Sequence, residues 1–514
     1  MFPATIPLLT VLLLALTLII TVLMFLTRKH QDRSLLPPGP PGFPVLGNLP
    51  MLRGNFPHRT LQVMAQRYGP IMFLRFGQVP VVVVSNAEAA EMTLKSHGST
   101  FASRRKFQSS EYISYGSKGM VFSEYGAYWR NMRRVCMSHL LSASKVSSFA
   151  GVREGVVEAA VKSIKRAADG GEVVNVTEVV SHLVEDNMYK IVLGRSRDEE
   201  VNLNALLHEV FYVSGAFNLA DYVPWLGFFD IQGLTRRFKK LGKAVDQVLE
   251  KIIEEHHKGG SGSGATHASG NHRDFVDILL SLMYQPIDPR DEQNQVLDRT
   301  NIKAILLDTI AGSLETSTSI IIWALSELLK HPRVMRKLQD ELTNVVGLNK
   351  LVQETHLANL TYLDMVIKET LRLHPAGALF PRETNKDAMV NGYHIRNKTM
   401  VLINLWAIGR DPKAWSDNAE EYYPERFITN DYDYRGYNFM FIPFGSGSRG
   451  CPGIHLGLAM VKLVVAQLAH CFNWELPPNM TPDELDMTEK FGLSLPKAED
   501  LLAVPTYRFL LKST

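Results

Sequence analysis

A cysteine near the C-terminus stands in the most distinctive surroundings of this 514-residue chain. Cys451 comes directly before Pro452 and precedes an apolar run of helical periodicity that continues to Phe472. Because the first N–H groups of a helix lack partners and its N-terminal end is positive, a thiolate is stabilised there. Proline fits the first helical turn, where its missing N–H costs nothing. The position therefore predicts a thiolate that acts in chemistry.

The residues around this cysteine indicate which chemistry. Gly447, Gly450 and Gly453 allow the backbone to approach a bulky group and to aim N–H donors at the sulfur, Phe444 can exclude water, and Arg449 can meet an anion. A shielded thiolate with N–H donors and an adjacent cation is what a heme iron with an axial cysteine requires. The alternative is an inert cysteine in a glycine-rich turn. Composition alone produces this spacing with a probability on the order of one in ten thousand.

The other two cysteines and the overall charge exclude several classes of protein. Cys136 and Cys471 lie in apolar helical contexts, so we expect both to be inert. Three cysteines far apart argue against a disulfide framework and favour a reducing compartment. A net charge of +3 gives no reason to expect nucleic acid as a partner.

Helical periodicity dominates the elements that must position this site. Helices are expected at Ser142–Ala168, Leu234–His257, Asn301–Lys330, Val334–Val346, Tyr362–Leu373 and Gly453–Phe472. The few strand-like runs are Ile71–Phe76, Val79–Ser85, Thr399–Asn404 and Ala503–Leu511. The predicted class is therefore mainly α with a small β region built from both ends of the chain.

The N-terminus predicts a membrane anchor. Residues 6–26 carry no charge, and about 1.5 Å of rise per residue lets them span a bilayer core. A cleaved signal peptide is the alternative, but the basic residues come after the apolar run and no small-residue cleavage site is evident. Residues 1–27 are thus predicted as a transmembrane anchor, 28–50 as a basic and proline-rich hinge, and 51–514 as one catalytic domain. The positive flank places that domain in the cytoplasm.

A Gly/Ser-rich stretch at 258–273 predicts a flexible loop within the domain. His256, His257, His267 and His272 cluster around it and raise the alternative of a metal site. Because such a loop offers no rigid support for ligands, we favour solvated histidines.

Several motifs together resemble one family, the cytochrome P-450 superfamily of heme-thiolate monooxygenases. They are Tyr125–Arg134, Pro381–Glu383, Pro424–Phe427 and Pro443–Gly453. In detail the chain resembles plant microsomal A-type members of the clan devoted to specialised metabolism. The resemblance implies the cytochrome P-450 fold, with heme b between the long central helix and the cysteine loop, and Cys451 as the axial iron ligand.

The same resemblance assigns roles to residues around the heme. Trp129 and Arg133 are one helical turn apart and can both donate to a carboxylate. By resemblance, the residues that hold the heme are Trp129, Arg133, Arg382, Arg449, Phe444 and Gly445. Glu369 and Arg372 can pair on one helix face, and Arg426 completes a structural triad in the family.

The central helix carries a polar interruption. Glycine and hydroxyl residues weaken a helix centre, so we expect a local bulge with room for dioxygen near Gly312. By resemblance, Thr316 is the hydroxyl beside oxygen and Glu315 the acid that relays protons. A packing notch of small residues is the alternative. Ser313 stands where the family usually has a second glycine, and either a narrower groove or an added hydrogen bond would follow.

The expected reaction inserts one atom of O2 into a small lipophilic molecule. Since no dinucleotide-binding fingerprint is present, NADPH acts only through a membrane reductase, with cytochrome b5 as a second donor. By resemblance the pocket residues are Phe107, Ile113, Leu307, Ala311, Gly312, Leu379, Phe380 and Leu493. Their apolar character leaves phenolics or flavonoids, terpenoids and alkaloids equally open.

Two other functions compete with the monooxygenase. One is an oxygen-independent heme-thiolate isomerase or dehydratase, in which the acid–hydroxyl pair is typically lost. The other is a non-catalytic heme carrier. The expected location is the endoplasmic reticulum membrane, with a single pass and a cytoplasmic catalytic domain.

Overall fold

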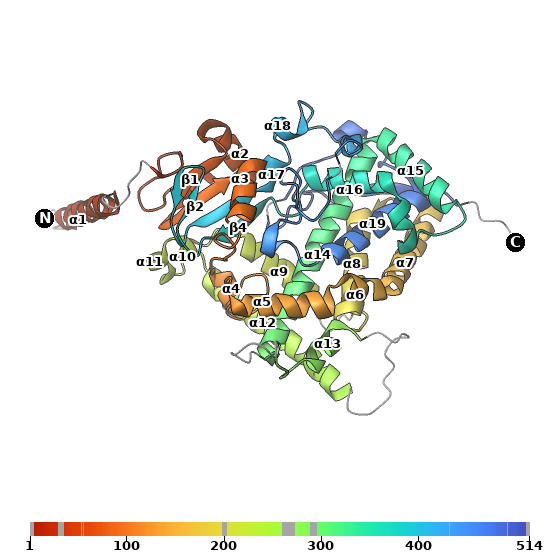
Figure 1. Ribbon diagram of the computed structural model, residues 1–514, viewed down its shortest axis with the longest axis horizontal. Coiled ribbons are helices and arrows are strands. Elements are labelled where there is room, and N and C mark those ends of the chain that lie inside the picture. Colours follow the sequence, from red (N-terminus) through yellow and green to blue (C-terminus); the bar gives the residue numbers. More distant parts are fainter. Residues whose placement is uncertain are drawn as a thin grey trace.

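The body of the protein is helical, with its four-stranded sheet at one side (Figure 1). The computed structural model describes residues 5–28, 35–52, 54, 56–197, 203–259, 273–287, 296–430, 432–490 and 492–509. The predicted class, mainly α with a small β region, is confirmed. Most of the predicted loop at 258–273 and part of the predicted hinge at 28–50 lie outside the described residues.

Five of the six predicted helices form with similar bounds. They are α12 (Leu234–Gly259), α14 (Arg299–Lys330), α15 (Pro332–Val346), α16 (Thr361–Leu373) and α19 (Ile454–Cys471). The sixth prediction was wrong in one respect, because Ser142–Ala168 is divided into α6 (Ala143–Ser148) and α7 (Ala150–Asp169). Phe149 leaves helical geometry at the break, and its buried ring packs edge-on against Phe275.

The remaining helices are mostly short. The longer ones are α2 (Pro57–Tyr68), α5 (Ala127–Val135), α8 (Val176–Val192), α9 (Leu203–Gly215) and α13 (Phe275–Ser281). The short ones are α3 (Ala87–Glu91), α4 (Gln108–Tyr112), α10 (Leu219–Tyr222), α11 (Pro224–Gly227), α17 (Leu405–Ile408) and α18 (Pro412–Trp415). Single turns occur at η2 (Leu49–Leu52), η5 (Glu354–Asn359), η6 (Pro424–Phe427), η7 (Gly447–Arg449) and η8 (Pro482–Glu484), and π-helical turns at η3 (Met92–Ser96) and η4 (Cys136–Leu140).

The largest sheet among the described residues joins two segments that are far apart in the chain, residues 71–84 and 379–404. Its order is β1 (Ile71–Phe76), β2 (Val79–Val84), β7 (Met400–Asn404), β4 (Leu379–Glu383). β2 and β7 pair in parallel, with Val82 opposite Val401, and both strands are almost entirely buried. Smaller sheets are formed by β3 (Val174–Asn175), β9 (Leu502–Tyr507) and β8 (Phe472–Glu475), and by β5 (Ala388–Val390) with β6 (Tyr393–Ile395).

Helix α14 is the central element (Figure 1). It packs against α8 and α19, and most of its side chains are buried. Asp298 caps its first turn by accepting the Asn301 N–H at 2.7 Å, while the Asn301 side chain accepts the Asp298 N–H at 3.0 Å. A helix that is apolar on all sides must lie inside a protein, so its few accessible residues mark a special face.

Two helices of the described part of the chain are long and apolar enough to cross a membrane, α14 and α19, but 56% and 61% of their apolar windows are buried inside the body. Helix α1 (Thr5–Arg28) forms where the anchor was predicted, and the side chains described in it are mostly apolar and mostly exposed. Its insertion into a bilayer remains a prediction.

Candidate functional site

Cys451 lies between the turn η7 and helix α19, as predicted. Helix α19 begins at Ile454 with Gly453 as its N-cap, so Pro452 precedes the helix instead of occupying its first turn. The Cys451 N–H donates to the Phe444 carbonyl at 2.8 Å and closes the loop. Burial raises the pKa of the Cys451 thiol, while the Gly453 N–H and the Arg133 guanidinium lower it.

The sulfur is surrounded by protein and yet reachable. Cys451 is exposed by surface area, although the protein around it is dense enough to desolvate the thiol. A side chain that faces an internal hollow has both properties. Cys136 and Cys471 differ, because they are buried and burial raises the pKa of each to about 12. These two thiols are therefore poor ligands.

Two glycines of the cysteine loop are required by its geometry. Gly445 and Gly447 have φ of +71° and +70°, which disfavours other residues. A Cβ on Gly447 would lie 2.8 Å from the Leu94 carbonyl oxygen, and one on Gly445 would lie 3.3 Å from the Phe380 ring. The loop is thus pressed against the segment that holds Phe380 and Arg382. Phe444 is half-buried and packs edge-on against Tyr434.

Beside the loop, four guanidinium groups converge without a counter-charge. They belong to Arg104, Arg133, Arg382 and Arg449. Burial and the neighbouring arginines lower the pKa of Arg382 far below its usual value and that of Arg449 to about 9. None of the four takes part in an ion pair among the described residues; Arg133, for example, donates to the Gly450 carbonyl at 2.9 Å. Like charges held together in this way require an anion with several negative oxygens.

The predicted roles of Trp129 and of the central helix need amendment. The Trp129 N–H donates to the Met120 carbonyl at 3.1 Å instead of remaining free, so its donation to an anion stays a prediction. The expected bulge was wrong, because α14 is a continuous α-helix through this region. The hydroxyls of Ser313 and Thr316 bond back to carbonyls of the preceding turn at 3.1 and 2.6 Å without displacing the helical ladder.

The accessible face of α14 nevertheless lies where the polar interruption was predicted. Gly312 is exposed, and a Cβ added to it would meet nothing within 4 Å. Glu315 and Thr316 are partly buried on the same stretch. One carboxylate oxygen of Glu315 is buried with no hydrogen-bond partner within the described part of the chain. An open space at Gly312 and an unused acceptor three residues further along the same helix suit proton transfer to a small molecule.

The structure brings Glu369, Arg372 and Arg426 together in the interior. Arg372 binds both carboxylate oxygens of Glu369, at 2.7 and 2.8 Å, and Arg426 donates to one of them at 2.9 Å. The arginines also donate to carbonyl oxygens of Gly409, Ala419 and Glu421. Each buried charge is thereby satisfied, and the network ties α16 to the loop that precedes the cysteine.

The predicted pocket residues are spread over several clusters. Ile113 and Leu307 belong to the main core, Phe107 and Leu379 pack in the cluster beneath β1 and β2, and Phe380 lies against Gly445. Ala311 is partly buried beside Gly312. Leu493 is 51% exposed and lies apart from these clusters.

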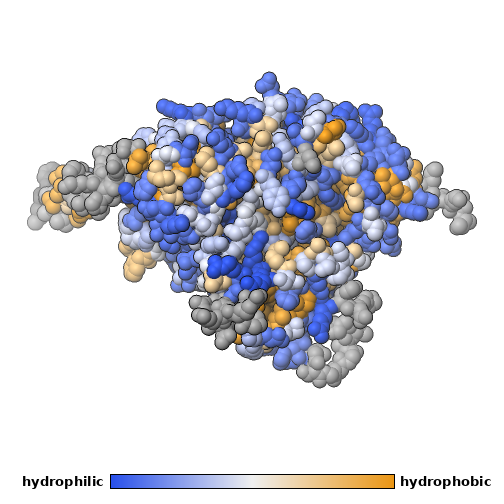
Figure 2. Space-filling view, in the orientation of Figure 1, coloured by the Kyte–Doolittle hydropathy of each residue, from blue (hydrophilic) through white to orange (hydrophobic). Residues whose placement is uncertain are grey.

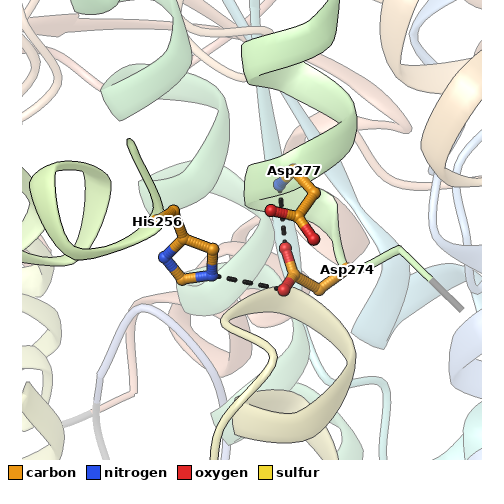
Figure 3. Close-up of side chains that lie close together, drawn as sticks. All are labelled: His256, Asp274 and Asp277. Carbon is orange, nitrogen blue, oxygen red and sulfur yellow. Dashed lines mark hydrogen bonds and ion pairs between the residues drawn. The ribbon is translucent and has the colours of Figure 1, made fainter. Parts of the chain in front are cut away.

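The histidines predicted in a solvated loop divide into two groups. His267 and His272 lie outside the described residues. His257 is exposed, whereas His256 lies in the last turn of α12, where its ring contacts the Asp274 carboxylate at 3.2 Å (Figure 3). Asp274 also accepts the Asp277 N–H at 2.8 Å and caps α13. Hydrogen bonds thus join His256, Asp274 and Asp277.

Comparisons with known proteins agree with this geometry. The family model for cytochrome P-450 matches residues 37–504. A cytochrome P-450 of Panax ginseng, CYP736A12, is 50% identical over 510 residues, which cover 99% of this chain and 100% of the relative. The norfluorocurarine oxidase of a Strychnos species is 41% identical over 473 residues, 90% of this chain and 91% of the relative. The tabersonine/lochnericine 19-hydroxylase of Catharanthus roseus is 38% identical over 470 residues, with the same shares covered.

A solved structure shows the same fold. A zebra fish cytochrome P-450, determined with abiraterone, has a TM-score of 0.69 and 25% identity, covering 88% of this chain and all of that one. The chain therefore belongs to the cytochrome P-450 family. It is a heme-thiolate monooxygenase, and its cofactor is heme b.

The residues present fit this cofactor. Heme carries two propionates, and the four unpaired guanidinium groups supply the positive charge that such a dianion requires. The accessible thiol of Cys451 lies near them and would hold the heme iron. Arg104 was missed in the sequence, because its place beside Pro381 joins segments far apart in the chain.

Proposed function

We propose that this protein oxidises a small lipophilic plant specialised metabolite with O2 and with electrons that a membrane reductase takes from NADPH. The observation that carries the proposal is the accessible thiol of Cys451, and the exposed Gly312 in the largely buried helix α14 adds to it. Two relatives support it by name, since one is an oxidase and another a 19-hydroxylase. Bound heme supplies activation of O2 and insertion of one oxygen atom into a C–H bond.

The residues divide this work. Cys451 holds the iron; Arg382, Arg449, Arg133 and Trp129 orient the propionates; and Phe444 and Gly445 close the cysteine side of the heme. Glu315 and Thr316 deliver protons at the open face of α14. The Glu369 triad holds the cysteine side rigid. Arg104 is added to the propionate group, because it contributes to the charge that Arg382 and Arg449 experience.

Membrane contact is proposed at two places. Helix α1 is the anchor, and an apolar patch made of Trp225, Phe228, Phe229 and Ile231 is the second contact. Phe228 is 89% exposed, and Figure 2 shows apolar atoms at the edge where α10 and α11 lie in Figure 1. Residues 45–49 of the chain pack in the same cluster as α10 and α11, so the patch and the segment that follows the anchor share one end of the body.

Product mass after turnover tests the proposal. Membranes that contain the protein and a plant reductase receive NADPH and a panel of phenolics, terpenoids and alkaloids. We expect a product heavier by one oxygen atom that requires NADPH and is absent with Cys451→Ser. Conversion of an added peroxide without NADPH would instead establish the isomerase or dehydratase, and NADPH that is never consumed, with any substrate of the panel, would establish the carrier.

A further inference from the structure

The backbone of Met120 connects the central helix α14 to Trp129 and to Arg449, one of the arginines beside the cysteine loop. Its N–H donates to the Asp308 carboxylate of α14 at 2.6 Å, and the next N–H, from Val121, reaches the same oxygen at 3.0 Å. Its carbonyl oxygen accepts the Trp129 N–H at 3.1 Å and the Arg449 guanidinium at 3.2 Å. The side chains predicted to meet the heme propionates therefore rest on a peptide that α14 holds in place.

Helix α14 and the segment 119–123 lie in unusually close contact. A Cβ on Gly119 would lie 2.2 Å from the Asp308 carboxylate oxygen, so no larger residue fits while both groups keep their places. The Ser123 hydroxyl donates to the Gly119 carbonyl, and the Ser123 carbonyl accepts a second bond from Arg449. The segment 119–123, here called the brace loop, is thus fixed at one side by Asp308 and supports Arg449 at the other.

A contribution to the stability of the fold does not explain the presence of Asp308. It is 9% exposed, and no ion pair among the described residues includes it. Burial raises its pKa to about 6, although the Val121 and Met120 N–H groups lower it. An acid whose pKa rises on folding makes the folded state less stable as the pH increases from 3.8 to about 6. The titratable groups that face it do not offset this effect, because burial also raises the pKa of Tyr128 and of Cys136, which are neutral.

We infer that Asp308 is a positioning residue for the heme: it fixes the brace loop so that Arg449 is aligned on the propionates. The inference rests on the proposed propionate role of Arg449. It gives the helix that is proposed to deliver protons a second task, since α14 sets where the cofactor edge lies. The distance between Gly312 and the heme is then determined by one helix, one carboxylate and one loop.

The test measures how fast the reconstituted full-length protein loses hemin to apomyoglobin. Asp308→Ala removes the acceptor of two N–H groups, and we expect hemin release about tenfold faster, with the thiolate-type carbon monoxide spectrum retained. Asp308→Asn keeps an acceptor oxygen without the charge, and we expect release within about twofold of the unchanged protein. Hemin release that is as fast in Asp308→Asn as in Asp308→Ala would overturn the inference.

A matched control removes a comparable carboxylate elsewhere. Asp274 is buried and also accepts a backbone N–H, at 2.8 Å, but it lies at α13 beside His256 (Figure 3). Asp274→Ala should destabilise the fold without faster hemin release. Equal release from the Asp274 and Asp308 variants would show that general destabilisation explains the effect and would overturn the inference.

A double-mutant cycle with Gly119 isolates the contact itself. Gly119→Ala should release hemin quickly, because the added methyl group pushes the brace loop off Asp308. In the presence of Asp308→Ala the same methyl group has room, so the two effects should be far from additive. Additive effects would contradict the inference. Arg449→Ala distinguishes a failure of the proposed propionate role from a failure of the role of Asp308. Unchanged hemin release in Arg449→Ala would show that Arg449 does not bind the propionates. Fast release in Arg449→Ala, together with unchanged release in Asp308→Ala, would exclude only the role of Asp308.

Discussion

The Thr316 hydroxyl donates to the Gly312 carbonyl oxygen, one turn earlier in α14, at 2.6 Å. This bond occupies the only hydrogen that the hydroxyl can donate, while its lone pairs stay available to accept. Thr316 must therefore rotate its hydroxyl before it can donate to a molecule in the space beside Gly312. The same bond satisfies the carbonyl next to the exposed glycine, so the resting arrangement is stable.

Thr316→Ala removes this hydroxyl and should uncouple electron use from oxidation. We expect heme to remain bound, NADPH to be consumed, and hydrogen peroxide to replace most of the organic product, with product formation falling about 10²-fold. Thr316→Ser keeps the hydroxyl and should restore most of the coupling. The check is the ratio of product to NADPH oxidised, and an unchanged ratio in the alanine variant would exclude Thr316 from proton delivery.

Cys451→Ser should abolish the thiolate-type absorption of the reduced carbon monoxide complex. The reason is that serine cannot supply a thiolate to the iron. Cys136→Ser and Cys471→Ser are the controls, since burial raises the pKa of both thiols to about 12 and removes them as ligands. Their spectra should stay unchanged. A thiolate-type band that survives Cys451→Ser would identify a different ligand.

Glu369→Ala should be among the most destabilising single changes. It leaves Arg372 and Arg426 buried without their carboxylate, at a cost of about 3–5 kcal/mol in the free energy of unfolding. Denaturant unfolding checks this prediction. Glu158→Ala is the control, because Glu158 pairs with Lys162 on α7 with both side chains largely exposed, and its loss should change stability by less than about 1 kcal/mol. Similar effects of the two variants would contradict the structural role of the triad.

The surroundings of Glu327 predict that the fold loses stability in acid. Burial alone would raise its pKa, but hydrogen bonds from His331 and His374 outweigh burial and lower the pKa to about 2. A carboxyl with a lowered pKa stabilises the fold above 4.5 and loses that contribution as the pH falls from 4.5 to 2, here about 3 kcal/mol. Melting temperatures measured between pH 2 and 7 should decline less steeply for Glu327→Gln. A parallel decline in both proteins would exclude this cause.

The apolar patch at Trp225–Ile231 should bind bilayers independently of α1. A chain without residues 1–34 should still associate with lipid vesicles. Replacing Phe228, Phe229 and Ile231 with serine should weaken the association about a hundredfold or more, because each buried side chain contributes about 1.5–3 kcal/mol. Vesicle flotation measures the difference. Equal flotation of both proteins would assign the interaction to another surface.

The cysteine loop and the glutamate–arginine pair could be predicted because their residues are close in sequence. Phe444 to Gly453 is one continuous segment, and Glu369 and Arg372 are three residues apart on one helix. Arg104 and Asp308 could not be found in this way, because each acts on a segment that the fold brings from far away in the chain. Their local sequences carry no pattern that indicates the partner.

The secondary structure, too, could be predicted where the local sequence determines it and could not where distant pairing determines it. Strands β1 and β2 were predicted because they are continuous runs of apolar and β-branched residues. Strand β4 was missed because Leu379–Glu383 contains a proline and two charged residues, and its pairing with β7 compensates for its weak propensity. The bulge in α14 was predicted wrongly because the hydroxyls of Ser313 and Thr316 fit into the regular helix.

The parallel pairing of β2 with β7 has a consequence for biosynthesis. Residues 81–84 cannot pair with residues 400–403 until the latter have been synthesised. At about 5–20 residues per second, the ribosome needs roughly 15–60 s to reach them. Throughout that interval the run Val79–Val84 has one unpaired, fully apolar edge of the kind that aggregates. A nascent chain of this protein therefore depends on shielding of its β1–β2 hairpin during translation, and slow codons between these strands lengthen the exposure.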